Sequence, residues 1–413
     1  MANRILTTHV GSLPRPDKLI AAAHDRTVDG KDESVFEKEL KGAVADVVRH
    51  QKEVGVDLIN DGELGHTMGW AYDYGSWWSY VVRRLDGVEV VKHGLWTTPL
   101  KPVKGLAPND FQLGNWGDRR DFNKFAEAYG DPASGCNVPE QFMTHYSPIV
   151  AGPIKYKGHA AIQRDIANFK AGLKAAGLGT EGAWMNAVAP ASCSRFASDY
   201  YKTEEELMYA CADAIREEYK AIIDAGFTLQ LDDPAIGESW DQCKDEPTVE
   251  GYRKYTKLCL DVLNHSIKGL PSNKIRFHLC WGSWHGPHTT DIPMKHLIDL
   301  MLAVNCDYYS FEAANARHEH EWKLWKNVKL PPGKKILPGI VGHSTNLIED
   351  PELVADRIIR FAEAVGPENV IASTDCGLGG RVHPQIAWAK LKTLSEGAAL
   401  ASKQLWQGRA AAA

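Results

Sequence analysis

Residues 274–283 read KIRFHLCWGS, and this stretch decides which fold the chain can adopt. Its apolar run predicts a buried β-strand over 275–280. Side chains at positions i and i+2 of a strand project from the same face, so His278 and Cys280 point at one spot. An imidazole and a thiol that meet in this way fit a metal site, a redox centre or an ordinary buried pair.

The same alternation of strands and helices extends along most of the chain. Eight strands are predicted, at 5–10, 57–61, 184–189, 228–232, 275–280, 307–312, 335–341 and 370–375. Helical patterns lie at 17–25, 37–55, 203–226, 248–268, 293–304, 351–366 and 385–405. Strands joined by helices form parallel sheets, and eight of them predict an α/β fold of the closed (β/α)8 type, the TIM barrel. An open doubly wound sheet is the alternative, although no GxGxxG or P-loop motif follows any strand.

The start of the helix at 203–226 has its own signature. Thr203 is the expected N-cap and Glu206 completes a capping box.

Residues 66–160 interrupt the alternation after the second strand. They are rich in glycine and contain five tryptophans: Trp70, Trp77, Trp78, Trp96 and Trp116. The stretch PIVAGPIKY at 148–156 indicates one arm of a β-hairpin. We interpret residues 1–413 as a single barrel domain in which 66–160 form an insertion that lies over one end as a lid. Its aromatic side chains either line a substrate pocket or only pack the lid.

Bulk composition limits the kind of protein and its partners. The chain has 413 residues, 44% hydrophobic and 24% charged, which is typical of a soluble globular protein. A net charge of −6 predicts no nucleic-acid partner. No apolar run reaches the roughly 18–20 residues of a membrane span, and the start lacks the layout of a signal peptide, so we expect a cytoplasmic location. The expected partners are small molecules, and the oligomeric state is left open.

Cysteine usage supports the same compartment. The eight cysteines are scattered, without a CxxC pair, which disfavours a disulfide framework in a chain of this length.

Nearly every predicted strand ends in ionisable or polar residues, the place where barrel enzymes hold their catalytic groups. The ends read THVGS, NDGE, QLDDPAIGE, FHLC, SFEA, VGHS and STDCG. Four side chains among them suit zinc, which prefers Cys, His and carboxylate ligands. They are His278, Cys280, Glu312 and Cys376. Competing histidine ligands lie in loops beyond the strands, at His285, His288, His318 and His320.

Seven motifs, taken in order, resemble the catalytic half of cobalamin-independent methionine synthase. They are TTHVGSLPRP (7–16), DGE (61–63), LQLDDPA (229–235), HLC (278–280), FEAANAR (311–317), GHSTN (342–346) and STDCGLGGR (373–381). The resemblance implies a (β/α)8 barrel whose zinc activates the thiol of homocysteine for attack on a methyl group. The implied zinc ligands are His278, Cys280, Glu312 and Cys376, the four side chains that the strand ends also suggest.

The chemistry explains why such a site is needed. A free thiol titrates near pH 8.5, and the reactive form is the thiolate, which coordination to zinc produces. Four protein ligands would close the site, so the substrate sulfur must displace one of them or expand the coordination shell. We expect Glu312, a hard oxygen ligand on a borderline ion, to be the labile one.

The resemblance implies further roles for residues at other strand ends. Val10, Gly11 and Ser12 would hold the amino-acid carboxylate through their backbone, although Ser12 also fits a plain helix cap. Glu63 and Asp232 would hold the ammonium group.

Two more roles concern the methyl donor. His343 would protonate the departing nitrogen, unless it is an ordinary hydrogen-bonded residue. Glu238 would hold the pterin ring of a tetrahydrofolate donor. Trp281 and Trp284 are candidates for the wall beside the bound sulfur.

The chain departs from the family pattern on the donor side. An Arg-Cys pair that contacts folate before the third strand has no counterpart in HYSPIVAGPI (145–154). The tryptophan that stacks on the pterin is missing as well, with Arg195 and Phe196 in its neighbourhood. The N-terminal half of full-length methionine synthase also has no counterpart. The thiol-activating half therefore keeps the motifs of the family pattern, and the electrophile-binding half departs from it.

Four functional hypotheses follow. The first is zinc-dependent methyl transfer to a homocysteine-like thiol from 5-methyltetrahydrofolate or another methyl compound. The second keeps the zinc-thiolate chemistry with a non-folate electrophile, as in epoxyalkane:coenzyme M transferases or in demethylation of a small molecule. Glu63 and Asp232 fit coenzyme M poorly, because it carries no ammonium. The third is a zinc hydrolase. The fourth is a metal-free barrel such as uroporphyrinogen decarboxylase.

Overall fold

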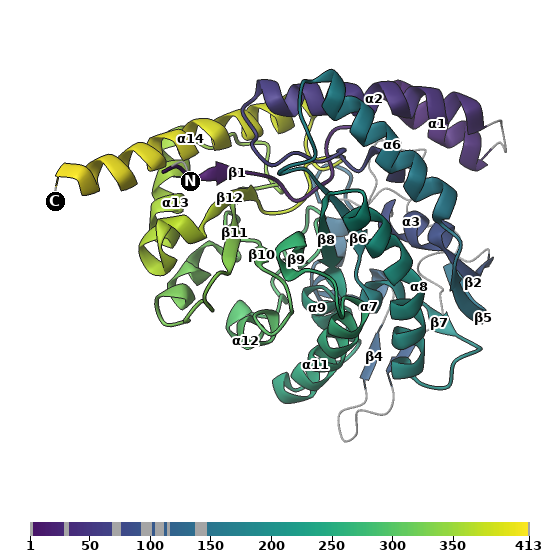
Figure 1. The fold of residues 1–413 in the computed structure, drawn as a ribbon. Coiled ribbons are helices and arrows are strands. Elements are labelled where there is room, and N and C mark those ends of the chain that lie inside the picture. The colour runs from purple at the N-terminus through teal and green to yellow at the C-terminus, as the bar shows by residue number, and fades with distance from the viewer. Residues whose placement is uncertain are drawn as a thin grey trace.

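The fold is built on a parallel sheet of seven strands that curls in the middle of the molecule (Figure 1). The computed structural model describes residues 3–28, 33–67, 76–91, 101–103, 111–113, 116–136 and 147–411. In spatial order the strands are β1 (Leu6–Thr7), β12 (Ile371–Thr374), β11 (Lys335–Val341), β10 (Tyr308–Phe311), β9 (Ile275–Leu279), β8 (Thr228–Asp233) and β6 (Trp184–Val188).

The strand order confirms seven of the eight predicted strands and excludes the alternative fold. Neighbours in the sheet follow one another along the chain, and the first strand pairs with the last, Leu6 opposite Ile371. An open doubly wound sheet would instead reverse its order at a switch point. The sheet therefore curls, and strands from the two ends of the chain lie next to each other at one edge of it.

The predicted strand at 57–61 is wrong as a strand. Its backbone still bridges the edges of the sheet, because Thr7 O accepts from Leu58 N at 3.0 Å and Ile59 O accepts from Trp184 N at 3.0 Å. Side chains supply the other partners: Asn60 Oδ1 accepts from Gly62 N at 2.7 Å, and Asp61 Oδ1 accepts from Glu63 N at 3.0 Å. Such local bonds of Asn and Asp compete with a regular ladder.

Long helices cover the outside of the sheet. They are α1 (Asp17–Val28), α2 (Glu33–Glu53), α6 (His159–Ala175), α8 (Glu204–Asp224), α11 (Val249–Ser266), α13 (Pro351–Val365) and α14 (Pro384–Ala411). Short helices are α3 (Ser76–Arg84), α4 (Arg120–Lys124), α5 (Ala126–Gly130), α7 (Pro190–Cys193), α9 (Pro234–Gly237), α10 (Ser239–Gln242) and α12 (Ile298–Met301). The last helix, α14, extends past the rest of the molecule at the C-terminus (Figure 1).

Two helix predictions have contrasting outcomes. The capping box of α8 is confirmed, since Thr203 Oγ1 accepts from Glu206 N at 3.1 Å and Glu206 Oε2 accepts from Thr203 N at 3.3 Å. The helix predicted at 293–304 is broken into a 3₁₀ turn, Met294–His296, and the four residues of α12. The break falls at Leu297, whose φ of −122° is far from the helical value.

A second, smaller sheet joins two strands of the insertion region to a short strand that follows β6. β2 (Leu85–Val91) is antiparallel to β5 (Ser147–Tyr156), and β5 pairs in parallel with β7 (Ala197–Ser198). A further pair joins β3 (Lys101–Val103) and β4 (Phe111–Leu113). Trp70 and Trp96 lie outside the described residues, as do the side chains of Trp77, Trp78 and Trp116. These five tryptophans therefore do not test whether the aromatic side chains of 66–160 line a pocket or only pack a lid.

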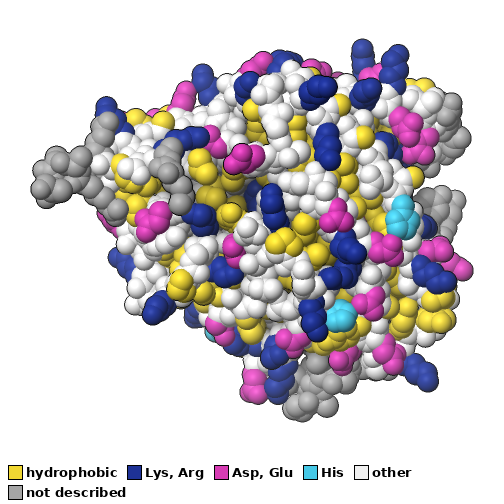
Figure 2. Space-filling view, viewed as in Figure 1, with side chains coloured by type: hydrophobic (Ala, Val, Ile, Leu, Met, Phe, Trp, Pro, Cys, Tyr) yellow, Lys and Arg dark blue, Asp and Glu magenta, His cyan; other side chains and the backbone are white. Residues whose placement is uncertain are grey.

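The charges at the surface and the character of the helices agree with what the composition predicts. On the face drawn in Figure 2, basic and acidic side chains are interspersed. Among the described helices, none combines the length and the apolar character required to cross a bilayer.

The register of the parallel sheet gathers polar groups at one edge. Asp232 of β8 lies level with His278 of β9, which in turn lies level with Ser310 of β10. The carboxyl ends of all these strands face the same side, where barrel enzymes carry their sites.

Candidate functional site

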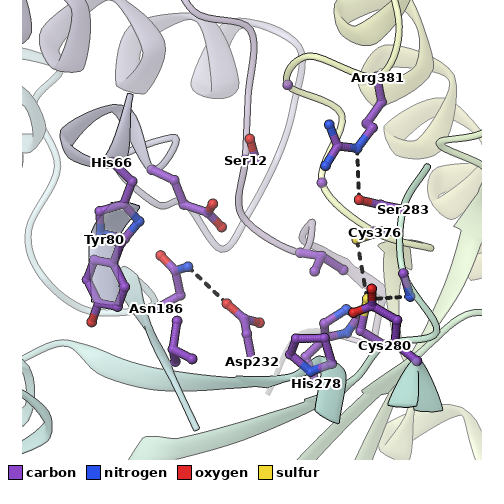
Figure 3. A pocket seen from close by; sticks show the side chains of 18 of the residues that line it. Ser12, His66, Tyr80, Asn186, Asp232, His278, Cys280, Ser283, Cys376 and Arg381 are labelled. Carbon is purple, nitrogen blue, oxygen red and sulfur yellow. Dashed lines mark hydrogen bonds between the residues drawn. The ribbon is translucent and has the colours of Figure 1, made fainter. Parts of the chain in front are cut away.

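A cavity of about 150 Å³ opens at the carboxyl edge of the sheet (Figure 3). Its lining comes from residues far apart in the chain: Val10, Ser12, Glu63, His66, Tyr80, Asn186, Val188, Asp232, Pro234, Glu238, His278, Cys280, Gly282, Ser283, Trp284, Cys376, Gly377, Gly379 and Arg381. Three of the four predicted metal ligands and five of the six predicted substrate-binding residues are among them. The sixth, Gly11, lies directly behind this wall.

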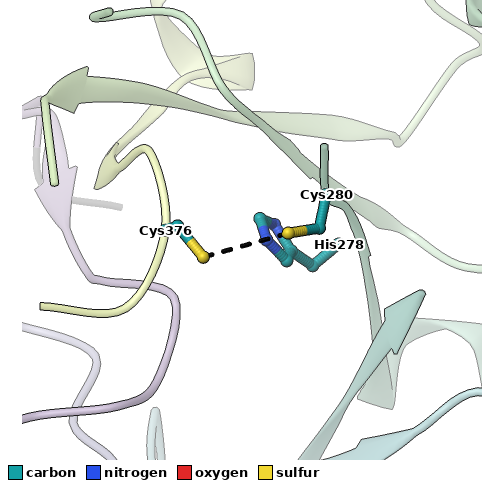
Figure 4. Close-up of side chains that lie close together, drawn as sticks. All are labelled: His278, Cys280 and Cys376. Carbon is teal, nitrogen blue, oxygen red and sulfur yellow. Dashed lines mark hydrogen bonds between the residues drawn. The ribbon is translucent and has the colours of Figure 1, made fainter. Parts of the chain in front are cut away.

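The sulfur and imidazole side chains form a tight cluster. His278, Cys280 and Cys376 each offer a ligand atom, and these atoms lie within 4.8 Å of one another. The two sulfur atoms are 4.0 Å apart, and all three side chains point at a common centre (Figure 4). The prediction that strand ends bring these residues together is confirmed for this trio.

The cluster has the chemistry of a zinc site. His278 Nδ1 contacts Ser310 Oγ at 3.1 Å, which orients the ring. The other ring nitrogen, Nε2, is buried, and within the described part of the chain it has no hydrogen-bond partner. Two thiols and one imidazole with a buried, unpaired nitrogen fit a borderline-soft ion such as zinc.

The pKa values of the two thiols in the cluster are shifted in opposite directions. The contact between the Cys280 and Cys376 sulfur atoms, together with His278, holds the pKa of Cys376 well below its ordinary value. The same contact, together with burial, raises the pKa of Cys280 well above its ordinary value. Burial alone would lower the pKa of His278, but its contact with Cys376 raises it.

The fourth predicted ligand, Glu312, is not part of this trio. Its Oε2 accepts from Asn315 Nδ2 and from an Arg317 guanidinium nitrogen, both at 2.7 Å, and its Oε1 accepts from Trp281 N at 3.2 Å. It belongs to a neighbouring group of possible ligands with His343 and Asp375, again within 4.8 Å. Burial raises the pKa of Glu312 to about 7, against the opposing effect of Arg317.

His343 is fully buried at the end of β11. Neither ring nitrogen has a hydrogen-bond partner among the described residues. Burial lowers its pKa to about 3, while the neighbouring Cys376 acts in the opposite direction. The ring is therefore neutral at physiological pH in the absence of added negative charge.

Two buried acids face the cavity. Asp232 accepts from Asn186 Nδ2 at 2.9 Å and from Gln230 Nε2 at 2.8 Å, as Figure 3 shows for Asn186. Burial and then the charge of Asp232 raise the pKa of Glu63 well above its usual range, and burial raises the pKa of Asp232 too. Two carboxylates forced together out of water attract a cation.

The backbone beneath Glu63 is strained. Glu63 has φ +56°, a left-handed conformation that non-glycine residues adopt rarely and mostly at functional sites. Gly11 has φ +144°, and a Cβ added there would lie 1.8 Å from Glu63 Oε1. Glycine at position 11 is what lets the Glu63 carboxylate pass close to the first strand.

The predicted carboxylate cradle is already partly engaged. Val10 N donates to Thr374 Oγ1 at 3.1 Å, and Gly11 N donates to His9 Nδ1 at 3.2 Å. Ser12 O accepts from the backbone of both Leu378 and Gly379 at 2.8 and 2.9 Å. The structure therefore places 10–12 at the cavity as predicted, with two of their three N–H groups directed at the chain itself.

Glu238 lies at the cavity, but it is held by two arginines. Arg195 donates to Glu238 Oε2 at 2.8 Å, and Arg119 forms an ion pair with Oε1. Burial alone would raise the pKa of Glu238, but Arg195 and Arg119 lower it. This carboxylate is ionised and charge-compensated before any ligand arrives.

The competing histidines have other roles. His288 Nδ1 contacts Asp291 Oδ1 at 3.2 Å and its Nε2 contacts Trp284 O at 3.0 Å, while His318 Nδ1 contacts Glu321 at 2.8 Å. Neither of these two, nor His285 or His320, belongs to a possible metal group among the described residues.

Several cavity residues were not singled out from the sequence. The Tyr80 and His66 rings are in tilted contact, with centroids 4.2 Å apart, and Asn186 donates to Asp232. Arg381, the last residue of the motif STDCGLGGR, donates to Ser283 Oγ at 2.8 Å. Of the two tryptophans expected beside the sulfur, Trp284 lines the cavity and Trp281 is buried behind it. Arg381 could have been found from the sequence because it ends a motif, whereas no sequence feature marked Tyr80.

Comparison with known proteins identifies related chains. A family model described as the catalytic domain of cobalamin-independent synthase matches residues 187–399, 213 of the 413 residues. The methionine synthase of Sulfolobus acidocaldarius is 24% identical over 406 residues, covering 97% of this chain and 93% of that protein. The methionine synthase of Thermococcus kodakarensis is 21% identical over 402 residues, covering 97% and 94%.

Solved structures support the fold. A B12-independent methionine synthase from a Shewanella species, in complex with selenomethionine, has a TM-score of 0.68 at 20% identity, covering 98% of this chain and 99% of that one. A putative vitamin-B12 independent methionine synthase from Listeria monocytogenes has a TM-score of 0.60 at 21% identity, covering 96% and 98%.

Proposed function

The chain belongs to the cobalamin-independent methionine synthase family, and from this premise we propose that it transfers a methyl group to the zinc-activated thiol of homocysteine. The observation that carries the proposal is the placement of two cysteines and a histidine beside two buried acids in one cavity. The first group suits a thiol and the second suits an ammonium, and homocysteine has both.

His278, Cys280 and Cys376 would hold the zinc ion, with Glu312 as the fourth ligand. Bound there, zinc would lower the pKa of the acceptor thiol and keep it as a thiolate. Asn315 and Arg317 supply an alternative partner for the Glu312 carboxylate, both at 2.7 Å. A carboxylate with a second stable position supports the expectation that Glu312 is the labile ligand.

Homocysteine would be oriented by its charged end. The ammonium group would lie between Glu63 and Asp232, where it relieves the repulsion that raises the pKa of Glu63. The carboxylate would lie near Ser12, since Val10 N and Gly11 N already have acceptors. These contacts fix the sulfur beside the cysteine pair and favour an amino-acid thiol over coenzyme M.

In the transfer step the sulfur electron pair forms the new S–C bond. The bond between the methyl carbon and the donor breaks, and its electron pair leaves with the donor. His343 is the candidate for supplying a proton to a basic leaving atom, because it is buried beside Cys376 with both nitrogens unpaired among the described residues. Negative charge built up next to the neutral ring favours its protonation.

The identity of the methyl donor and the closure of the barrel are also proposed. A 5-methyltetrahydrofolate donor is the family expectation, and another methyl compound is the second candidate, which the two arginines on Glu238 favour. Closure into an eight-part barrel is supported by segment 57–61, which hydrogen-bonds to β1 on one side and β6 on the other.

Metal analysis combined with an acceptor assay tests the proposal. The purified protein is expected to hold about one zinc per chain, and to form methionine from homocysteine and a methyl donor, detected by mass spectrometry. Cobalt(II) substituted for zinc should change its absorption when homocysteine binds, independently of any donor. Full activity in a metal-free preparation would refute the role of the cluster.

A further inference from the structure

We infer that residues 116–136 form a fixed cap on the donor side of the cavity, and that Arg119 in this cap restricts the enzyme to compact methyl donors. The inference rests on the proposed function and names the substrate class of the same site. The donor wall is defined here as Glu238 and Trp284, and the acceptor wall as Glu63, Asp232 and the His278, Cys280, Cys376 trio.

The cap is bound to the body through one buried carboxylate. Asp121 is inaccessible to solvent and accepts four hydrogen bonds. Its Oδ1 accepts from the backbone and hydroxyl of Thr289 at 2.7 and 2.9 Å, and its Oδ2 accepts from His288 N and Tyr129 OH, both at 2.9 Å. A buried acid satisfied on both oxygens makes a rigid attachment rather than a loose contact.

Arg119 lies directly before helix α4 and connects this attachment to the cavity. It is 1% exposed, forms an ion pair with Glu238, and has a second acid, Asp241, at 3.4 Å. Its guanidinium carbon also lies 4.1 Å from the ring centroid of Trp284. One side chain of the cap therefore fixes both members of the donor wall, so it is a positioning residue.

Trp284 has little freedom to move aside. His288 stacks on it with centroids 3.8 Å apart, and its Nε1 donates to Tyr129 OH of the cap at 2.9 Å. A Cβ added at Gly282 would lie 1.9 Å from the Trp284 ring. The tryptophan edge is held against the loop, and its faces are not offered to a ligand as a stacking surface.

Glu238 is compensated in the same way. Arg119 and Arg195 take one oxygen each, so two guanidinium groups oppose this carboxylate and Asp241. The four charges cancel, which removes the attraction that a bare acid would exert on a basic ring. The donor wall thus contributes shape more than charge.

The chemistry of the donor wall selects the donor. A fused basic ring is held in proteins by a face to stack on and an acid to pair with, and the donor wall offers neither. With the wall fixed by Arg119, a compact donor needs only to bring its methyl carbon to the sulfur, whereas a fused ring system finds no contacts that hold it. In the transfer the thiolate pair forms the S–CH₃ bond while the leaving group departs with its own pair.

Two donors of different size test this inference on the zinc-loaded full chain. Methyl iodide is the compact probe, 5-methyltetrahydrofolate the extended one, and methionine formed from homocysteine is quantified by mass spectrometry. The wild-type protein is expected to methylate homocysteine with methyl iodide faster than the metal-free protein does, and to leave 5-methyltetrahydrofolate at background. Arg119→Ala should raise methionine formation from 5-methyltetrahydrofolate about tenfold above that background and leave the rate with methyl iodide unchanged, so that the selectivity for the compact donor falls.

Matched variants separate positioning from folding. Arg120→Ala removes the next cap residue, which bonds Trp240 O and Glu246 at 2.7 Å, and it should leave selectivity unchanged. Arg119→Lys, which keeps the charge but not the forked geometry, should recover part of the selectivity. Should Arg119→Ala fail to fold, the comparison of the two donors on the wild type still decides the question.

The outcomes distinguish the inference from the proposed function. Saturable turnover of 5-methyltetrahydrofolate by the wild type, or unchanged selectivity in folded Arg119→Ala, overturns the cap inference while methyl transfer to homocysteine stands. Absence of any cobalt(II) spectral change with homocysteine, together with no zinc-dependent methylation by either donor, overturns the proposed function itself.

Discussion

The acceptor wall and the donor wall of the cavity differ in how far their charges are satisfied. On the acceptor wall, Glu63 and Asp232 repel each other, and His278 Nε2 is buried with no partner among the described residues. On the donor wall, Glu238 is ion-paired on both oxygens. A buried group that lacks a partner or lies beside a like charge costs free energy until a ligand arrives, whereas a paired charge only defines a shape. Under our proposals, one wall binds the charged atoms of the acceptor and the other limits which donors can be held.

Removal of a cluster cysteine should break the acceptor wall most severely. Cys376→Ala is expected to abolish stoichiometric zinc binding. It should also raise the activation free energy of methyl transfer by several kcal/mol, which lowers the rate about a thousandfold or more. Elemental analysis and methionine formation measure the two effects. Cys136→Ala is the control, since Cys136 contacts Ser134 and lies apart from the trio. Zinc retained in Cys376→Ala would mean that the ion binds elsewhere.

Neutralising one acid should weaken the acceptor wall without removing the metal. Glu63→Gln is expected to cost about 2–3 kcal/mol of homocysteine binding, roughly 30- to 150-fold in Kd, because the ammonium loses a buried charge. Calorimetry with 4-mercaptobutanoate, a thiol without the amino group, supplies the control. An equal loss for both thiols would contradict the ammonium role and indicate damage to the pocket.

Asp233 tests where the acceptor wall ends. It follows Asp232 on the opposite face of β8, and its carboxylate accepts from Ser192 Oγ at 2.8 Å. Burial raises the pKa of Asp233 to about 7, so between pH 4 and 7 the folded protein keeps a proton that the unfolded chain releases. Its contribution to stability is complete below about pH 4 and is lost as the pH rises toward 7.

Asp233→Asn should therefore flatten the fall in stability with rising pH by at most about 1.4 kcal/mol per pH unit. Urea unfolding at several pH values between 4 and 7 measures the slope. Asp261→Asn, at a side chain that is 52% exposed, serves as the surface control. The same slope in Asp233→Asn and wild type would show that this carboxyl does not hold the proton.

The smallest effect should come from a site that belongs to neither wall. Thr203→Ala removes the capping box of α8 and is expected to lower stability by about 1 kcal/mol. Thermal unfolding gives the shift, and homocysteine affinity and donor selectivity should stay at the wild-type values. A change in either would imply that overall stability, rather than local charge, controls the difference between the walls.

Local patterns account for what could be predicted from the sequence. Seven strands have clear apolar runs, and the trio follows from the rule that i and i+2 share a face together with the meeting of parallel strand ends. Helix α8 carries both residues of its capping box within four positions. By contrast α6 was missed, and its N-cap Gly158 makes no side-chain bond that would mark the start.

Long-range pairing accounts for most of what could not be predicted. Arg119 and Glu238 are 119 residues apart, and nothing in either neighbourhood indicates the other. Glu312 was correctly placed at a strand end, but its partners Asn315 and Arg317 hold it outside the sulfur trio. Segment 57–61 has the apolar start of a strand, and the side chains of Asn60 and Asp61 then bond the following backbone.

The pairing of the first strand with the last has a consequence for synthesis of the protein. Cys376 follows β12, whose partner is β1, and Ser12 O accepts from Leu378 N and Gly379 N. Cys280 and Cys376 are 96 residues apart, so at roughly 5–20 residues per second the first thiol precedes the second by about 5 to 20 s. During synthesis the proposed ligand set therefore stays incomplete until Cys376 has been added and its loop has paired with the segment that follows the first strand.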